Sequence, residues 1–215
     1  MKVLVTGTSS GIGRAIALKF LSENHTVIGM DIEESTIEND KYTHIKKDIL
    51  DSDLPKIDGV EILVNNAGVQ ESGRDIDINL KGTINITETY GIQSSIKSVV
   101  FIASASARTG AEFPEYVASK GGMVAYMKNV ALRIAKYGAT SNSISAGGVE
   151  TKLNEHIMNS EKLWNEVLNE TLLNKWAKAE EIAEFAYFIA VINKSMTGED
   201  IFVDNGEALK SNFVW

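Results

Sequence analysis

The feature that most constrains the fold is a glycine-rich segment between an apolar run and a helical pattern. Residues 3–5 read Val-Leu-Val, and an unbroken apolar run of this kind suits a strand buried on both faces of a parallel sheet. Residues 6–13 read TGTSSGIG, and Ile12, Ile16 and Phe20 then recur at helical spacing. A strand, a glycine turn and a helix in this order predict a cradle for a phosphate group.

The glycines of this segment have separate physical roles. Gly7 allows a sharp exit from the strand, Gly11 lets the backbone approach a pyrophosphate, and Gly13 permits close packing of the helix on the sheet. The helix N-terminus offers free N–H groups and the positive end of its dipole to the anion. We therefore expect the phosphates of a dinucleotide to bind at Gly7, Ser9, Ser10, Gly11, Ile12 and Gly13.

Apolar runs and helical patterns alternate along the rest of the chain. Strands are expected near residues 26–28, 62–64, 99–102, 141–145 and 201–203, and helices over 11–23, 121–136 and 180–191. This order predicts a single Rossmann-type α/β domain over residues 1–215, with a doubly wound parallel sheet flanked by helices. Because Asp31, Asp48 and Asn65 follow one another at intervals of only 17 residues, the helices between strands two and four should be stunted or absent.

Composition excludes several classes of protein. The chain has no cysteine, so it has neither a disulfide framework nor a thiolate metal site, and His25, His44 and His156 do not form a ligand cluster by spacing. Its net charge of -8 disfavours nonspecific nucleic-acid binding, and no stretch has the length of a membrane span. We expect a cytoplasmic protein with no metal, no nucleic-acid partner and no membrane anchor.

Asp31 bears on the choice of cofactor. It ends the second predicted strand, where a carboxylate accepts hydrogen bonds from the adenosine ribose and repels a 2′-phosphate, which favours NAD over NADP. Residues 32–36 add two glutamates and no cation, and Arg14 is the nearby charge that opposes this preference. Asp48 ends the third predicted strand and either reaches the adenine or serves as an ordinary turn residue.

Tyr116 and Lys120 form a candidate acid/base pair. At a spacing of i, i+4 on a helix, the two side chains share one face, one turn apart. A free tyrosine has a pKa of about 10, and a neighbouring lysine cation stabilises its phenolate form. The pair predicts general acid–base catalysis at Tyr116.

The ordered set of motifs resembles the classical short-chain dehydrogenases/reductases. After TGTSSGIG come NNAG at residues 65–68, Asn79 in INLKG, the serines of IASAS, YVASK, NSISAGGVET and TGEDIFVDNG. The resemblance implies that Tyr116 exchanges a proton with the substrate oxygen, while Lys120 binds the nicotinamide ribose. It also implies that Ser104 hydrogen-bonds the substrate oxygen and that Asn79 holds a water of a proton relay.

Further positions follow from the same resemblance. It implies that Asn66, Ala67 and Gly68 lie beside the cofactor, that Val149 and Thr151 contact the nicotinamide carboxamide, and that residues 151–175 bind the substrate. The sequence departs from the usual pattern of the family at two positions. Ser104 stands 12 residues before Tyr116, one fewer than is usual in the family, which leaves Ser106 as a competitor, and Ala146 replaces a common proline.

The predicted function is NAD-dependent hydride transfer between an alcohol and a ketone or aldehyde, with a small-molecule substrate. Two alternatives stay open: a reductase of 3-oxoacyl groups on an acyl carrier protein, and a non-catalytic NAD-sensing regulator. The family pairs the helix over 121–136 and the helix near 79–89 across a two-fold axis. We therefore expect a homodimer or a homotetramer.

Overall fold

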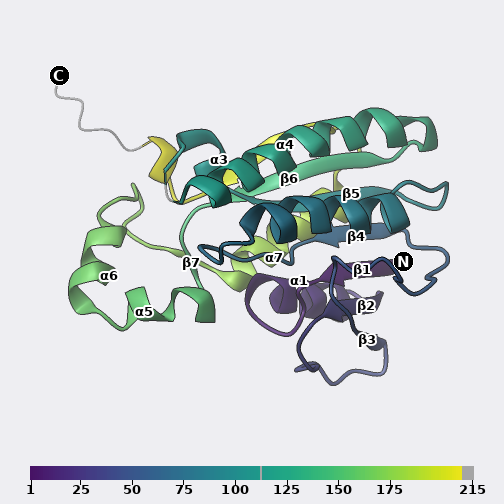
Figure 1. Cartoon of the computed structure of the whole chain (residues 1–215), viewed down its shortest axis with the longest axis horizontal. Helices are drawn as coiled ribbons and strands as arrows, with labels where there is room; N and C mark the ends of the chain where they lie inside the picture. Colours follow the sequence, from purple (N-terminus) through teal and green to yellow (C-terminus); the bar gives the residue numbers. More distant parts are fainter. Residues whose placement is uncertain (112, 210–215) are drawn as a thin grey trace.

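The computed structural model describes residues 1–111 and 113–209, and its centre is a parallel sheet of seven strands (Figure 1). The spatial order is β3-β2-β1-β4-β5-β6-β9. The strands are β1 (Lys2–Thr6), β2 (Thr26–Asp31), β3 (Tyr42–Lys46), β4 (Ile62–Asn65), β5 (Ser98–Ser104), β6 (Thr140–Ala146) and β9 (Asp200–Val203). This is the Rossmann-type sheet that the sequence predicts.

The direction of sheet growth reverses beside β1. β1 pairs in parallel with β2 on one side and with β4 on the other, with Val3 opposite both Val27 and Ile62. In open α/β sheets, ligands bind at such a switch point, beyond the carboxyl ends of the strands. The fold therefore places the candidate site where β1 and β4 end.

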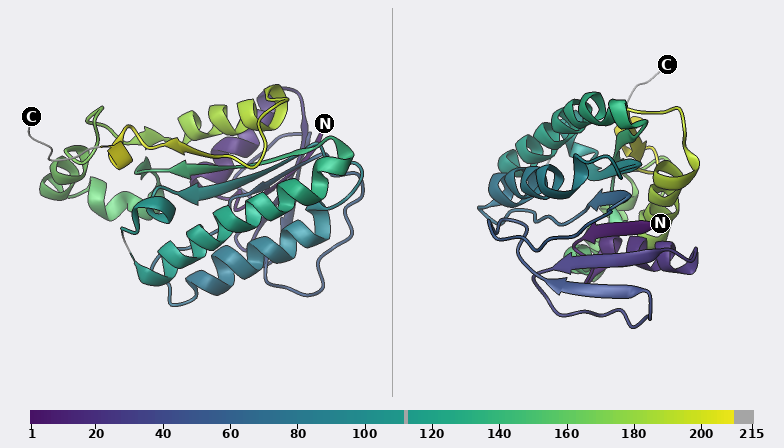
Figure 2. Two further views of the ribbon diagram at one scale, coloured as in Figure 1. Left: turned by 90° about the horizontal axis from the view of Figure 1, so that it is seen from above. Right: turned by 90° about the vertical axis from the view of Figure 1, so that its right-hand side faces the viewer.

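Helices cover both faces of the sheet (Figure 2). On one face, α1 (Gly11–Ser22) packs against α7 (Ala179–Tyr187), which continues as the π-helical turn η5 (Phe188–Ile192). On the other face, α4 (Pro114–Ile134) lies beside a long helix composed of η1 (Ile76–Gly82), α2 (Thr83–Ile86) and η2 (Thr87–Gly91). Met123 and Val130 of α4 are buried in the hydrophobic core between this pair of helices and the sheet.

The connections on either side of β3 contain no helix within the described residues. Residues 32–41 and 47–61 form only turns and extended chain, which confirms the expectation from their short length. These loops cover the edge of the sheet by burying Ile37, Ile49 and Val60. The adenosine end of the switch point is therefore bordered by loops.

Two element boundaries bear on the sequence prediction. α4 runs from Pro114 to Ile134 and contains the helical segment predicted at Tyr116–Lys120. It begins two residues before Tyr116, because proline at the first helical position has no N–H to lose and a preset φ. Asp48 does not end β3. The strand stops at Lys46, and the Asp48 carboxylate accepts a hydrogen bond from the Leu50 N–H in a turn.

Residues 151–175 project beyond the carboxyl ends of the strands (Figure 1). They contain η4 (Lys152–Asn154), α5 (Glu155–Met158) and α6 (Glu161–Leu168), and none of these helices contains a fully buried residue. The short strands β7 (Val149–Glu150) and β8 (Ala177–Lys178) pair at the base of the segment. The remaining elements are α3 (Ser106–Thr109), η3 (Ala135–Tyr137) and η6 (Glu207–Leu209). In the described part of the chain, no helix is long and apolar enough to cross a bilayer.

Candidate active site

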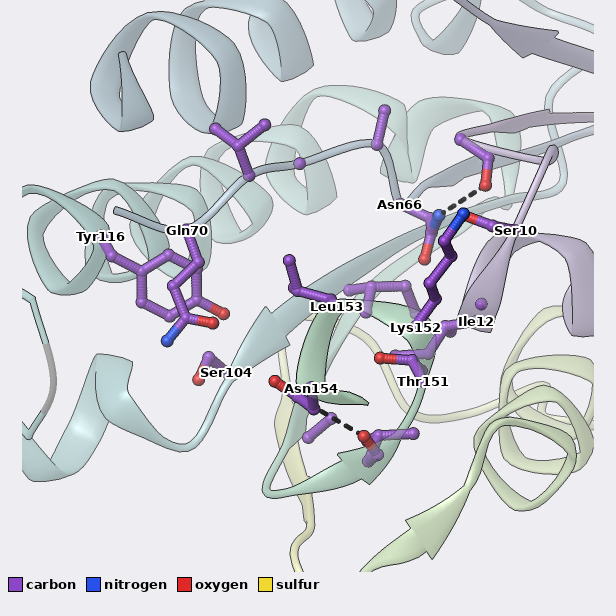
Figure 3. A pocket seen from close by; sticks show the side chains of 18 of the residues that line it. Ser10, Ile12, Asn66, Gln70, Ser104, Tyr116, Thr151, Lys152, Leu153 and Asn154 are labelled. Carbon is purple, nitrogen blue, oxygen red and sulfur yellow. Dashed lines mark hydrogen bonds between the residues drawn. The ribbon is translucent and has the colours of Figure 1, made fainter. Parts of the chain in front are cut away.

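A cavity of about 790 Å³ lies over the carboxyl ends of the strands. Asp31 and Asp48 line it together with the glycine-rich loop, and Ser104 and Tyr116 line it as well. Figure 3 shows the two catalytic candidates at one end of the view and Ser10, Ile12 and Asn66 at the other. One continuous cavity thus contains the predicted phosphate cradle and the predicted acid/base pair.

The glycine-rich loop has the geometry of a phosphate cradle. Gly7 has φ +74°, in the left-handed region that favours glycine. A Cβ at Gly13 would lie 2.0 Å from the Gly7 carbonyl oxygen, so only glycine lets α1 start this close to β1. No described side chain caps the N-terminus of α1 at Ser10, which leaves its N–H groups available to an anion.

Most of the predicted cofactor residues line the cavity: Gly7, Ser10, Gly11, Ile12, Asp31, Asp48, Asn66, Ala67, Gly68, Tyr116, Lys120, Val149 and Thr151. Ser9 and Gly13 do not line it. Both are buried, and the Ser9 hydroxyl donates to the Glu33 carbonyl instead. Asn66 supports the cradle, since its Nδ2 donates to the Thr6 and Gly7 carbonyls at 3.0 and 3.2 Å.

The Asp31 carboxylate is held in place by two backbone N–H groups. Ser9 N donates to Oδ2 at 2.8 Å, and Glu33 N donates to Oδ1 at 3.0 Å. Arg14, the cation that opposes NAD preference, instead donates from Nε to the Thr36 hydroxyl at 3.1 Å. Lys47 also lines the cavity, but its ammonium pairs with two nearby aspartates, Asp51 and Asp53.

Tyr116 and Lys120 lie on the first turns of α4 and face the cavity. Lys120 is buried, its Nζ donates to the Ile102 carbonyl at 2.9 Å, and the same Nζ lies 5.6 Å from the centroid of the Tyr116 ring. The bond to the end of β5 fixes the ammonium beside the tyrosine. A cation at this distance stabilises negative charge on the phenol.

Ser104 and Ser106 have different surroundings. Ser104 ends β5 and lines the cavity, whereas Ser106 is buried outside its wall. The Ser106 hydroxyl donates to Ser104 Oγ at 2.9 Å, and the Ser106 N–H reaches the same oxygen at 3.2 Å. Ser104 is therefore the serine of this pair that faces the cavity, and Ser106 holds its oxygen in place.

Asn79 lies behind the cavity wall, in the π-helical turn η1. Its Oδ1 accepts from Val69 N at 2.7 Å, and its Nδ2 donates to the Val69 carbonyl and to the Ser119 hydroxyl at 2.8 and 3.0 Å. The side chain thus joins the segment after β4 to α4, beside Lys120. π-helical turns occur often at functional sites, where they displace one residue from the regular helical ladder.

Gln70 and Glu207 are cavity-lining residues that were not predicted from the sequence, whereas Lys152 and Asn154 lie in residues 151–175, which were expected to bind the substrate but without individual roles. Figure 3 shows the Lys152 side chain extending toward Ser10 and Asn66, which brings a cation to the phosphate end. Gln70 stands two residues after NNAG, and Glu207 directly follows the TGEDIFVDNG segment. Proximity to these motifs was the only signal, because nothing in the spacing shows which loop side chains turn inward. No group of three potential metal ligands occurs among residues 1–111 and 113–209.

Comparison with known proteins identifies the family. A family model described as enoyl-(acyl carrier protein) reductase matches residues 46–207. The 3-oxoacyl-(acyl-carrier-protein) reductase of Thermotoga maritima is 30% identical, with 94% of this chain and 96% of the relative covered. The chain belongs to the short-chain dehydrogenase/reductase family. It is an NAD(P)-dependent oxidoreductase that acts on alcohol and carbonyl groups.

Solved structures of the family agree on the fold. The ligand-free aldohexose dehydrogenase of Thermoplasma acidophilum has a TM-score of 0.89 at 27% identity, covering 100% of this chain and 96% of that one. A 4-hydroxyisoleucine dehydrogenase mutant with NADH and succinate has a TM-score of 0.89 at 26% identity, covering 99% and 100%. A 2-deoxy-D-gluconate 3-dehydrogenase, so assigned provisionally, from Agrobacterium tumefaciens with NADP has a TM-score of 0.87 at 25% identity, covering 97% and 96%.

The comparison also bears on the short connections between the strands. The alignment with the Thermotoga maritima reductase spans 237 positions, more than the 215 residues of this chain, so that relative has residues without a counterpart here. This short-chain dehydrogenase/reductase is a shortened member of its family. Its helix-free connections around β3 show one part of the fold that is reduced to loops.

Proposed function

We propose that this enzyme is an NAD-dependent dehydrogenase or reductase of a small alcohol or carbonyl compound, with Tyr116 as the general acid/base. The observation that carries this proposal is the shared cavity. Tyr116, Ser104 and Lys120 line the same space as the phosphate cradle and Asp31. A regulator that only binds a nucleotide has no need of this arrangement.

The residues present fit a nicotinamide dinucleotide. The open N-terminus of α1 suits the pyrophosphate, Asp31 suits the adenosine ribose, and Lys120 suits the nicotinamide ribose. Val149 and Thr151 line the wall at the base of residues 151–175, where they would contact the carboxamide. When bound, the nicotinamide supplies the hydride acceptor in oxidation and the hydride donor in reduction.

The chain itself carries the proton chemistry. During oxidation, the substrate hydroxyl gives its proton to Tyr116 as the carbinol C–H bond breaks, and the substrate becomes a carbonyl compound. Ser104 donates a hydrogen bond to the substrate oxygen, while the fixed Lys120 ammonium stabilises the phenolate. Reduction reverses these steps. Asn79 supports the relay that returns the proton to solvent.

Three observations support NAD over NADP. The Asp31 carboxylate is fixed at the cavity wall by two N–H groups, the Arg14 guanidinium bonds to Thr36, and Lys47 is paired with aspartates. A 2′-phosphate beside Asp31 would meet a like charge, while Lys47 is already ion-paired and Arg14 does not line the cavity. Structural relatives carry either NADH or NADP, so the preference depends on these local contacts.

Replacement of Tyr116 by phenylalanine tests the proposal. Tyr116→Phe keeps the ring but removes the transferable proton, and positioned acid–base catalysis is worth roughly 10²–10⁴-fold. We expect kcat to fall by that factor or more, with NADH affinity by fluorescence titration little changed. Tyr137→Phe is the matched control, because Tyr137 lies outside the cavity lining. Near-normal turnover of Tyr116→Phe would contradict the assignment.

The proposed assembly is a symmetric dimer, or a tetramer, in the cytoplasm. On the outer face of α4, the apolar side chain of Leu132 is 81% exposed. At the end of α7, the stacked pair Phe185 and Phe188 lies near Ile192, and 42% of Phe188 and 57% of Ile192 are exposed. Exposed apolar side chains on α4 and at the end of α7 support one contact for a dimer and a second for a tetramer.

The second candidate function is reduction of 3-oxoacyl groups on an acyl carrier protein. It is favoured by the name of the Thermotoga maritima relative. The name of the matching family model also refers to an acyl carrier protein, although to enoyl rather than 3-oxoacyl groups. Both candidates use the same Tyr116 chemistry and differ only in the substrate. The polar groups of the cavity wall bear directly on this choice.

A further inference from the structure

The cavity wall contains polar side chains that the proposed proton chemistry does not use. Gln70 comes from the segment after β4, Asn154 from η4 and Glu207 from η6, yet all three line the cavity that contains Ser104 and Tyr116. Figure 3 shows the Gln70 and Asn154 side chains in the same space as the Ser104 hydroxyl. Three distant parts of the chain thus bring hydrogen-bonding groups to one site.

These groups retain hydrogen-bonding capacity after their contacts within the described chain are counted. Asn154 Nδ2 donates to the Val149 carbonyl at 2.9 Å, which leaves Oδ1 as an acceptor. Glu207 Oε2 accepts from Gly148 N at 3.2 Å, which leaves Oε1. The Gln70 amide makes no hydrogen bond to another described residue, so it offers two donors and an acceptor.

Glu207 is suited to an uncharged partner. Burial raises the pKa of its carboxyl group, and the neighbouring carboxylates of Asp204 and Glu170 act in the same direction. A raised pKa favours the neutral carboxylic acid, which does not need a cation as its partner. A hydroxyl group can accept a hydrogen bond from the acid or donate one to the carboxylate. Glu170 lines the same cavity, which further disfavours an anionic substrate.

The rest of this wall is apolar and aromatic. It is formed by Leu153, Ile157, Val167 and Trp176. Trp176 is buried and stands edge-on to Trp164, with ring centroids 5.2 Å apart. Apolar surface beside several hydrogen-bonding groups matches a molecule with C–H faces and many hydroxyl groups.

We infer that the substrate is a polyhydroxylated carbon chain, an aldose or a polyol, whose hydroxyl groups beside the reacting carbon bind Gln70, Asn154 and Glu207. This inference rests on the proposed function and adds the substrate class. One CH–OH group is oxidised, its hydride passes to NAD and its proton to Tyr116. The acyl chain of a 3-oxoacyl thioester has no hydroxyl donor beside its reacting carbonyl, and a site built to bind hydroxyl groups rejects an analogue without them.

A substrate panel tests the inference. NAD reduction is measured with D-glucose, D-mannose, xylitol, 2-butanol and 1-amino-2-propanol, and NADH or NADPH oxidation with acetoacetyl-coenzyme A. We expect kcat/KM for the best aldose or polyol to exceed that for every other compound at least tenfold. A better value for the simple alcohol or the amino alcohol would overturn the inference and leave the proposed function intact. A better value for the thioester would overturn the inference in favour of the second candidate function. No turnover with any class would contradict both.

Two variants test the residues themselves. Glu207→Gln and Gln70→Leu should each raise KM for the best aldose or polyol about tenfold, with a smaller change in kcat, and lower its preference over 2-butanol. Glu161→Gln, an exposed glutamate of α6 outside the cavity lining, is the matched control and should leave KM unchanged. Thermal melting and NADH titration check folding. If Glu207→Gln does not fold, Gln70→Leu decides, and an unchanged KM in a folded variant overturns the inference.

Discussion

Two hydrogen bonds join Ser106 to Ser104, but the two serines differ in access to the cavity. Since only Ser104 lines the cavity, Ser104→Ala should lower kcat/KM by about 10²-fold or more, as expected for loss of a donor to developing charge. Ser106→Ala removes the hydroxyl that donates to Ser104, so we expect a smaller loss of about tenfold, which is about 1.4 kcal/mol. Steady-state kinetics of both variants measure this order. A larger loss in Ser106→Ala would make Ser106 the substrate-binding serine.

Asp31 should set the cofactor preference. Two N–H groups fix its carboxylate, and a 2′-phosphate beside it carries about two negative charges, by analogy with protein phosphates. We expect kcat/KM to favour NAD over NADP at least about tenfold, or roughly 1.4 kcal/mol. The comparison uses one accepted alcohol with both cofactors. Arg14→Ala should keep this preference, because Arg14 bonds to Thr36. Equal values for the two cofactors would show that the reasoning from Asp31 is wrong.

At the scale of elements, side chains join the loop after β2 and the strand β3 to the glycine-rich loop. The Tyr42 hydroxyl bonds to the buried Thr8 hydroxyl at 2.8 Å and to His44 Nδ1 at 3.1 Å. The Thr36 hydroxyl donates to the Ser9 carbonyl at 2.9 Å. These contacts hold the phosphate cradle in place where no helix covers this edge of the sheet.

Loss of the Tyr42 hydroxyl should therefore destabilise the fold. Tyr42→Phe keeps the ring but leaves the buried Thr8 hydroxyl without this partner, at a cost of about 1–3 kcal/mol in the free energy of unfolding. In a chain of this size, each 1 kcal/mol lowers Tm by roughly 2–4 °C. Thermal unfolding followed by circular dichroism measures the shift. Tyr137→Phe serves again as the control, and equal Tm values for the two variants would contradict the role of this contact.

The elements also show how far sequence reasoning extends. The doubly wound parallel sheet, the glycine-rich loop and the two covered faces follow from unbroken apolar runs and their spacing, because a parallel sheet buried on both faces admits few other patterns. The helix that contains Tyr116 and Lys120 was also predicted, and α4 begins two residues before Tyr116. Asp48 was placed at a strand end, because turn residues and strand ends look alike in a sequence.

The residues of the candidate site also fall into two groups, those that the sequence could predict and those that it could not. Residues that act through backbone geometry or fixed helical spacing, such as Gly7, Tyr116 and Lys120, could be predicted, since their neighbours in sequence are also their neighbours in space. Gln70 and Glu207 could not, because their position depends on how separate loops close over the cavity. Ser9 was expected to bind the cofactor, but its hydroxyl turns toward the loop after β2.

At the scale of the whole molecule, the exposed face of α4 predicts self-association. A two-fold contact brings each Leu132 near its symmetry mate or the same partner surface, so Leu132→Glu places two new charges in one interface. Light scattering at micromolar concentration should show a dimer or tetramer for the native chain and a halved mass for the variant. Leu173→Glu is the control, because Leu173 is exposed in residues 151–175, away from α4. A monomeric native chain, or an unchanged mass for Leu132→Glu, would contradict this interface.

The short connection between β2 and β3 also bears on the order in which the chain folds. Val27 and Tyr42, which pair across these strands, are only 15 positions apart, whereas Val3 and Ile62 of β1 and β4 are 59 apart. Closing a longer loop costs more entropy, and distant pairings slow the folding of parallel sheets. Pairing of β2 with β3, at the edge without crossover helices, thus has the lowest entropic barrier of these two pairings. Pairing of β1 with β4, where the proposed cofactor cradle forms, requires a far longer loop to close.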